Sequence, residues 1–203
     1  PYNAVGDGSA NDHLAIETAV AAAISQGKAL YFPEGNYKTT SRIVANGALS
    51  IVGDGEYKSF IRCFGSTGGL QANTGAGAQF HMENICFRSD AANNGIAIEA
   101  IGGYSPSNNI SNFKLRNVRV DASPSCGFDT GIILRDVFKG TADCITLLGG
   151  DSKDRWLTDG LILIGKCVEN RLNGIMVLGA SSGITITTTI EAIEGTHISS
   201  AIF

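Results

Sequence analysis

Hydrophobic residues recur every three or four positions in one stretch near the start of the chain. Ile16, Val20 and Ile24 fall on one face, together with several of the alanines around them. This spacing predicts an amphipathic helix over residues 12–26. Asp12 is a suitable N-terminal cap, and the glycine directly after the helix is a suitable stop.

After this helix the pattern changes to short apolar runs separated by turns. KALYF (28–32) is predicted to be a strand, and PEGNY (33–37) a turn into the next one. FHMENICF (80–87) and FKLRNVRV (113–120) then share the pattern F-x-apolar-x-N-apolar-x-apolar at an offset of 33 residues. A repeat of this length indicates stacked structural units.

Within each of these two segments the alternation shifts by one position at Asn84 or Asn117. The shift predicts a bend between two short strands, and Asn tolerates the left-handed conformation that a bend requires. If the segments are successive coils, equivalent residues stack in pairs: Phe80 with Phe113, Met82 with Leu115, Asn84 with Asn117, and, on the outside, Glu83 with Arg116 and Arg88 with Asp121.

A second repeat lies further along the chain. ILIGKCVE (162–169) and ITITTTIE (184–191) align at an offset of 22, so that Glu169 matches Glu191, and GIMVLG (174–179) supplies a strand between them. Coils of this length, each with several short strands, are what a parallel β-helix needs. Loops are expected to leave the coil at its corners, over 65–79, 88–95, 102–112, 122–130 and 150–160.

The sequence therefore predicts an all-β fold, a parallel β-helix (solenoid) with an N-terminal amphipathic capping helix. The helix at 12–26 would cover the open first coil, whose backbone groups and core are otherwise exposed. Residues 28–203 would form the coils of a single β-helix domain, 1–203. Because the chain starts at Pro1 without Met and stops in an apolar run, we expect a fragment of a longer protein.

Composition supports this fold and argues against several partners. Gly accounts for 26 of 203 residues and charged residues for 17%, as expected for short strands and tight turns. The net charge of -4, without a basic cluster, argues against nucleic acid. No apolar run is long enough to insert into a membrane. The five cysteines show no metal-site spacing, so neither a metal nor another cofactor is expected.

The opening of the chain resembles a known superfamily. NAVGDG, then Asp12 and the helix, then LYFPEGNY, is similar to the start of pectate-lyase-like single-stranded right-handed β-helix proteins, and most of all to bacteriophage tailspikes. This motif covers residues 3–37, and coil-like repeats continue to about residue 198. The family usually has Thr-Asp-Asp before the helix, where this chain has Ala-Asn-Asp; the difference bears on the first turn and not on the fold.

The resemblance implies a trimeric virion-tail protein that acts on a polysaccharide at the host cell surface. Relatives include pectate lyases, polygalacturonases, endoglycosidic tailspikes and non-catalytic adhesins, so the fold does not decide the reaction. The polygalacturonase motifs Asn-Thr-Asp, Asp-Asp, Gly-His-Gly and Arg-Ile-Lys are absent. Carboxylates are scattered, which argues against a calcium-assisted lyase.

Glycoside hydrolysis needs two carboxyl groups across one bond, and the sequence offers two pairs. Asp151 and Asp154 lie in one loop, GGDSKDRW, beside Arg155 and Trp156, which could contact a sugar; the alternative is a solvated loop. Glu169 and Glu191 would stack one coil apart, with Glu194 nearby as a further substrate contact; the alternative is that both face solvent or pair with Lys166 or Arg171.

The leading hypothesis is a tailspike-type protein that binds and hydrolyses O-antigen, capsule or exopolysaccharide. The alternatives are a non-catalytic glycan-binding or structural module, and a polysaccharide lyase. The catalytic residues could also lie beyond residue 203 or between subunits.

Overall fold

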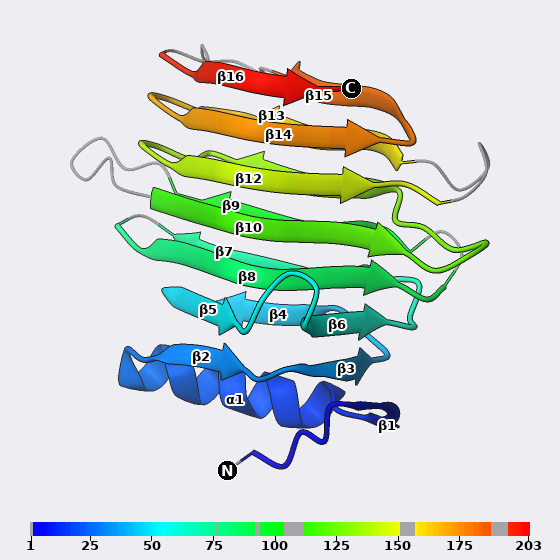
Figure 1. The fold of residues 1–203 in the computed structure, drawn as a ribbon. Helices are drawn as coiled ribbons and strands as arrows, with labels where there is room; N and C mark the ends of the chain where they lie inside the picture. The colour runs from blue at the N-terminus through cyan, green and yellow to red at the C-terminus, as the bar shows by residue number, and fades with distance from the viewer. Residues whose placement is uncertain (1, 76, 92–93, 104–111, 151–156, 188–194) are drawn as a thin grey trace.

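The computed structural model describes residues 2–75, 77–91, 94–103, 112–150, 157–187 and 195–203. One helix, α1 (His13–Gln26), lies beneath a stack of parallel strands that form two sheets (Figure 1). No helix in these ranges is long and apolar enough to cross a membrane.

The two sheets form opposite walls of the coil. The ten-stranded front sheet contains β1 (Asp7–Asn11), β2 (Ala29–Phe32), β3 (Gly35–Thr39), β5 (Leu49–Gly53), β6 (Ser59–Cys63), β8 (Gln79–Ser89), β10 (Asn112–Ala122), β12 (Thr141–Leu148), β14 (Arg171–Leu178) and β16 (His197–Ile202). The six-stranded back sheet contains β4 (Ile43–Asn46), β7 (Leu70–Gly75), β9 (Ile96–Gly102), β11 (Thr130–Arg135), β13 (Leu157–Ile164) and β15 (Ala180–Thr187).

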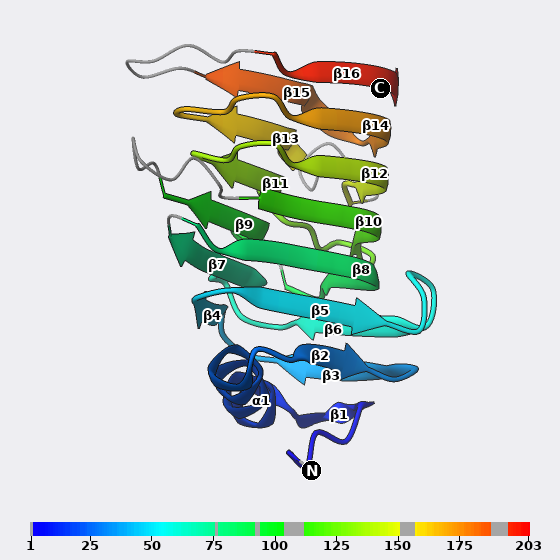
Figure 2. The same cartoon turned by 90° about the vertical axis from the view of Figure 1, so that its left-hand side faces the viewer.

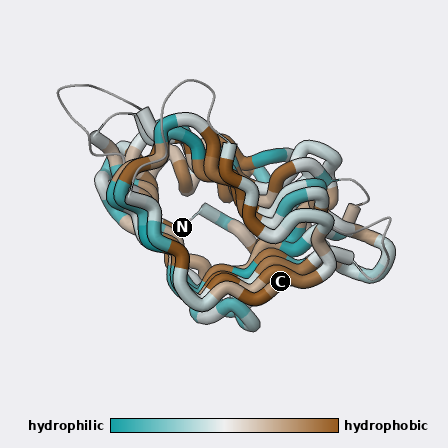
Figure 3. Tube along the Cα trace, turned by 90° about the horizontal axis from the view of Figure 1, so that it is seen from above, coloured by the Kyte–Doolittle hydropathy of each residue, from teal (hydrophilic) through white to brown (hydrophobic). Residues whose placement is uncertain are grey.

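The chain runs along the front sheet, returns along the back sheet and rises by one strand at each circuit (Figures 1 and 2). The direction of this rise makes the coil right-handed, as parallel crossover connections almost always are. Seen along the axis, successive coils superimpose (Figure 3). The predicted right-handed parallel β-helix is therefore confirmed.

The core consists of columns of apolar side chains between the two sheets. Met82, Leu115, Ala142 and Leu172 occupy the same register position in β8, β10, β12 and β14, and all are fully buried. Since side chains alternate across a strand, the residues next to these positions face outward. This alternation places polar side chains on the outer wall at equally regular intervals.

Helix α1 covers the first coil, as the sequence predicts. Ile16 and Val20 are 2% exposed and belong to the core, and Gly27 ends the helix in the left-handed conformation. Asp12 precedes the helix, but its side chain does not cap it. The Asp12 carboxylate accepts hydrogen bonds from the N–H groups of Val5 (2.6 Å) and Gly6 (3.1 Å), and thereby fixes the N-terminal arm.

The bend predicted inside the front strands is confirmed. Asn84 and Asn117 have φ of 57° and 51°, and the side-chain amide of Asn117 donates to the side-chain oxygen of Asn84 at 2.9 Å. The stacked pairs predicted around them are also in register. Arg88 and Asp121 face each other as backbone partners, but Arg88 donates to Ser123 and Asp121 binds Arg119.

The second predicted alignment is wrong by one residue. Leu161 pairs with Ile184, so the offset between β13 and β15 is 23 and not 22. The run Leu161–Ile164 is apolar throughout, and its sequence does not show which residues point inward. A slip by one residue exchanges the two faces of a strand: Leu161 and Leu163 are buried, and Ile162 is not.

The predicted loop over 65–79 is also wrong in part, because it contains strand β7. Leu70 and Ala72 point into the core and are 1% and 0% exposed. A strand with two inward residues among many glycines gives only a weak alternation signal.

Candidate functional site

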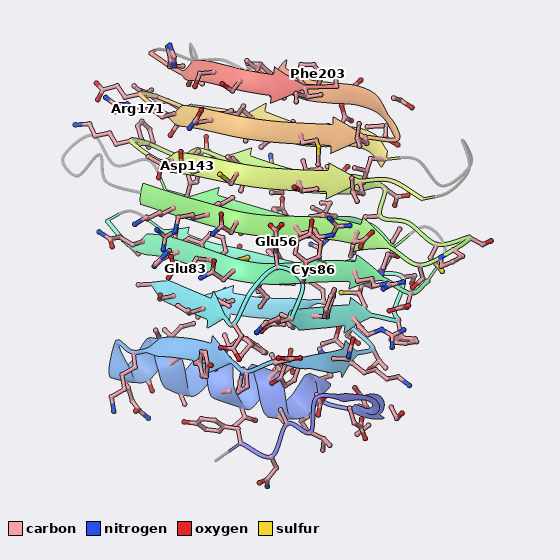
Figure 4. The ribbon with its side chains drawn as sticks, in the orientation of Figure 1. Glu56, Glu83, Cys86, Asp143, Arg171 and Phe203 are labelled. Carbon is pink, nitrogen blue, oxygen red and sulfur yellow. The ribbon has the colours of Figure 1, made fainter. Side chains whose placement is uncertain are left out.

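The outer face of the front sheet carries a column of polar side chains. Glu83, Arg116, Asp143 and Asn173 are register partners on β8, β10, β12 and β14. They face outward because each follows an inward core residue of the same strand. Glu83 and Asp143 lie one above the other on this face (Figure 4).

Glu83 is held as an ionised carboxylate. Its side chain is 16% exposed, and its Oε2 lies 2.7 Å from Nη2 of Arg116 and 3.4 Å from Nε2 of His81. Burial alone would raise the pKa of Glu83, but the hydrogen bond and charge of Arg116, together with His81, outweigh burial and lower it. Glu83 can therefore accept a proton or stabilise a positive charge.

Asp143 is the second carboxylate of the column. It is separated from Glu83 by the strand of Arg116, hence by about 9.5 Å between backbones. In the described part of the chain no hydrogen bond or ion pair engages the Asp143 carboxylate. Inverting glycosidases hold their two carboxyl groups about 6.5–9.5 Å apart, a spacing that side chains on two strands with one strand between them can reach.

A loop over residues 53–59, which we call the hairpin, connects β5 and β6 and projects in front of this face (Figures 1 and 2). Its tip carries Glu56 and Tyr57, and Glu56 lies in front of the sheet between Glu83 and Cys86 (Figure 4). No contact among the described residues neutralises the Glu56 carboxylate. The outer face thus brings together three carboxylates, one of which is paired.

Two adjoining hollows lie along the edge of the same sheet where β10, β12 and β14 begin. The first has a volume of about 370 Å³ and is lined by Gln79, Phe80, His81, Phe113, Lys114, Lys139 and Thr141. The second has a volume of about 540 Å³ and is lined by Lys139, Gly140, Thr141, Glu169, Arg171 and Gly195. Because both include Lys139 and Thr141, they form one continuous depression with a mainly cationic rim.

Of the residues predicted as catalytic, Glu169 lies in the second hollow. Its side chain is 62% exposed, and its Oε2 is 3.8 Å from Nζ of Lys139. Gly195 packs against it from the next coil, and a Cβ there would lie 3.4 Å from Glu169 Cγ. Its predicted partner, Glu191, lies outside the described ranges, so the pair stays a prediction.

The remaining predicted site residues lie outside the described ranges. They are Asp151, Asp154, Arg155 and Trp156 in one segment, and Glu191 and Glu194 in another. Their predicted roles stay predictions.

Two further carboxylates are engaged in ion pairs and hydrogen bonds on the wall of the coil. Glu99 is 5% exposed on the back sheet and binds Arg42, Gln71 and Arg135. Such saturation leaves the Glu99 carboxylate no free position for a substrate. The second, Asp90, accepts two hydrogen bonds from one guanidinium at a corner of the front sheet.

Metal binding has no support in the described ranges, where no group of three or more His, Cys, Asp or Glu side chains could hold an ion. All five cysteines are free thiols, and three of them are buried.

Asp143, Glu56 and Tyr57 were not singled out by the sequence. Asp143 belongs to a third copy of the repeat, at an offset of 27 from Arg116, but Cys144 stands where the first two copies have Asn. The positive φ of 55° at Cys144 shows that the bend is the same. A repeat pattern that allows any residue at the bend would have included Asp143. Nothing in the sequence indicates the direction in which the hairpin projects.

Comparison with known proteins supports a carbohydrate-related family. The profile of the family "Rhamnogalacturonase A/epimerase, pectate lyase-like" matches residues 1–164. A glucan 1,3-beta-glucosidase of Cochliobolus carbonum is 44% identical over 70 residues, which are 34% of this chain and 9% of that protein.

Two solved structures are similar to parts of this chain. ORF18 of Geobacillus virus E2 matches with a TM-score of 0.51 and 17% identity, over 88% of this chain and 40% of the viral chain. The Agl-KA catalytic domain matches with a TM-score of 0.48 and 15% identity, over 98% and 45% of the two chains. This chain thus spans less than half the length of each of these proteins. Since the family profile covers most of its residues, the chain belongs to the rhamnogalacturonase A/epimerase, pectate-lyase-like family of parallel β-helix proteins.

Proposed function

We propose that this β-helix binds a bacterial surface polysaccharide and cleaves it by endoglycosidic hydrolysis. The observation that carries the proposal is the pair Glu83 and Asp143, in register two strands apart on an open face. Family membership supports a polysaccharide as the substrate, and the adjoining depression offers room for further sugar units.

In this proposal Glu83 is the general base and Asp143 the general acid. Glu83 takes a proton from a water whose oxygen attacks the anomeric carbon, while Asp143 gives its proton to the departing glycosidic oxygen. The low pKa of Glu83 keeps it ionised at neutral pH.

Asp151, Asp154, Glu169 and Glu191 remain a second set of proposed catalytic carboxyl groups, with Arg155, Trp156 and Glu194 as proposed sugar contacts. Each of the four catalytic candidates is tested by changing its carboxyl group to an amide: Asp151→Asn, Asp154→Asn, Glu169→Gln and Glu191→Gln. Loss of activity in one of these variants, with Glu83→Gln and Asp143→Asn unaffected, would move the reaction to that residue.

We further propose that the protein acts as a homotrimeric tailspike on the virion tail and grips O-antigen, capsule or exopolysaccharide at the host cell surface. The fold shared with a Geobacillus virus protein supports a viral setting. Size-exclusion chromatography with light scattering tests the trimer: a monomer at micromolar concentration would argue against it for this chain.

The catalytic pair is tested by release of reducing ends from a panel of bacterial polysaccharides. Glu83→Gln and Asp143→Asn are each expected to lower the rate by about 100-fold or more while the circular dichroism spectrum is retained. Glu17→Gln, on the capping helix, is the matched control and should retain full activity. Full activity in both site variants would exclude them as the acid and base.

A non-catalytic glycan-binding module is the second candidate, and the direction of the resolved carboxyl pKa shifts favours it. Where a shift is resolved among the described carboxyl groups, the pKa is lowered, as at Asp7, Asp54, Glu83 and Asp90. A general acid needs a raised pKa. Retention of a polysaccharide without any product would favour binding alone, and unsaturated products would indicate a lyase.

A further inference from the structure

The projecting hairpin is built as a rigid support. Val52 pairs with Glu83 of β8, and Phe60 pairs with Cys86 of the same strand. Seven residues, 53–59, lie between Val52 and Phe60, whereas only two lie between their partners. The N–H of Gly55 donates to the carbonyl oxygen of Asn84 on β8 at 3.0 Å. The N–H of Ser59 donates to the carbonyl oxygen of Gly55 within the hairpin, also at 3.0 Å. These bonds tie the hairpin both to the sheet and to itself.

The base of the hairpin is fixed by side chains as well. The Asp54 carboxylate accepts hydrogen bonds from the N–H of Glu34 at 2.8 Å and from the hydroxyl of Tyr31. At Gly53 a Cβ would lie 2.2 Å from a carbonyl oxygen of β8, so only glycine fits. A loop with these constraints loses little further entropy when a ligand binds its tip.

Tyr57 stands on this support with its ring exposed and held in place. It is 67% exposed, yet the guanidinium of Arg119 lies 4.9 Å from the ring centroid and donates to the Tyr57 hydroxyl at 3.2 Å. Arg119 is itself fixed by two hydrogen bonds to Asp121, at 3.2 and 3.1 Å. Because the guanidinium lies against one face of the ring, the open area is the opposite face.

Cys86 lies on the outer face of β8, paired with Phe60 directly after the hairpin and with Arg119. It is the register partner of Arg119 on the outer face, where neighbouring positions are polar, and yet it is 0% exposed. Burial raises the pKa of its thiol. Cys86 is therefore a natural reporter of whether the packing beside Arg119 is retained.

We propose that the open face of Tyr57 is a stacking platform for one pyranose ring of the polysaccharide, about 10 Å along the strand direction from Glu83. A sugar ring presents a flat face of C–H groups that fits an aromatic ring, with hydroxyl groups at its rim. Glu56, which is half-buried, and Lys58, which is exposed, stand on either side of Tyr57 in the chain and can bind those hydroxyls. This inference rests on the proposed function and names a residue that positions its substrate.

The first test is a footprint of the wild-type chain with tetranitromethane, which nitrates exposed tyrosines. The probes are laminarin, dextran, polygalacturonate and purified bacterial O-antigen and capsule preparations. A polysaccharide that binds should protect Tyr57 severalfold and leave Tyr31 unprotected, since Tyr31 is also exposed, at 55%, but lies on β2, outside the proposed platform. Equal reactivity of Tyr57 with and without a bound polysaccharide would overturn the inference, as would equal protection of both tyrosines.

The second test is retention of variants in gels that contain the same polysaccharide. Tyr57→Phe keeps the flat face and should bind within about twofold of wild type, whereas Tyr57→Leu should bind about tenfold more weakly. Cys86 should stay unreactive toward iodoacetamide in both, which shows that the packing beside Arg119 is retained.

The failures of the two proposals are distinguishable. If no polysaccharide of the panel binds the wild-type chain, the proposed function fails and the platform fails with it. If one binds, and Tyr57→Leu binds it as tightly as wild type, only the platform is refuted.

Discussion

At the scale of single residues, the coil turns at positions that take a left-handed backbone. Asn84, Asn117, Cys144, Gly174 and Ser200 form one such column across the front sheet, with φ between 51° and 64°. Non-glycine residues adopt this conformation at a cost, and Asn offsets it with a local hydrogen bond. The bend is thus specified by backbone geometry and not by one residue type.

Asn117→Ala is expected to lower the free energy of unfolding by about 1–2 kcal/mol, because alanine strains the bend and removes the amide bond to Asn84. Asn117→Gly removes the bond without the strain and should cost less. Urea denaturation of both variants measures this difference. A glycine variant less stable than the alanine variant would contradict the role of the left-handed bend.

A second residue-scale prediction concerns Asp90, whose side chain is 6% exposed and bonded twice to Arg62 at 2.8 Å. Burial opposes ionisation, but Arg62 and Ser123 outweigh it and lower the pKa of Asp90. A lowered folded-state pKa stabilises the fold above the unfolded value of about 3.9 and loses that effect as pH falls through the folded value.

Asp90→Asn should therefore cost about 2–3 kcal/mol at neutral pH, and the difference from wild type should shrink below about pH 4. The measurement is urea denaturation across about pH 2.5–7, the range in which carboxyl groups titrate. Glu34→Gln is the control, since its pair with Lys58 is exposed and 3.8 Å long. A pH-independent loss at Asp90 would show that its charge plays no part.

At the scale of elements, helix α1 closes the end of the coil through one apolar face. Ile16 is 2% exposed against the core, whereas Leu14, two residues earlier, is 73% exposed. Ile16→Ala is expected to destabilise the chain by about 2–4 kcal/mol, and Leu14→Ala by less than about 0.5 kcal/mol. Thermal and urea denaturation compare them. Equal effects would mean that the helix does not cap the core.

How well each element could be predicted depended on how firmly its sequence fixes which face is buried. The coils that contain Phe80 and Phe113 alternate clearly and carry an Asn at the bend, so their register follows from the sequence alone. The run Leu161–Ile164 is apolar on both faces, and its alignment slipped by one residue. Patterning cannot decide register where both faces of a strand carry apolar side chains.

The candidate site was harder to predict than the fold because it depends on contacts between coils. The repeat predicted that Glu83 and Arg116 meet on the outer face. It did not include Asp143, because Cys144 replaces the Asn at the bend of that coil. The place of Tyr57 against Arg119 joins residues 62 positions apart. No local pattern encodes the direction in which a seven-residue hairpin projects.

At the scale of the whole molecule, each coil contacts its neighbours, so stability is expected to vary along the axis. Strand β10 lies between β8 and β12 and buries Leu115, Val118 and Val120 completely. Strand β16 pairs with β14, and its Ile202 is 62% exposed.

Hydrogen exchange followed by mass spectrometry should therefore find β16 amides exchanging at least tenfold faster than β10 amides. Strands β12 and β14 should fall between them. Uniform protection along the axis would indicate one cooperative unit, in conflict with a coil stabilised by nearest-neighbour contacts.

We propose that the outer face of this coil hydrolyses a polysaccharide, and digestion in oxygen-18 water is the decisive test. The chain is incubated with bacterial surface polysaccharides, and the products are analysed by mass spectrometry. We predict oligosaccharides that carry one oxygen-18 atom at each new reducing end, and their loss in Glu83→Gln and Asp143→Asn. Unlabelled, unsaturated fragments would show elimination instead of hydrolysis, and intact polysaccharide throughout would show that this face does not hydrolyse its ligand.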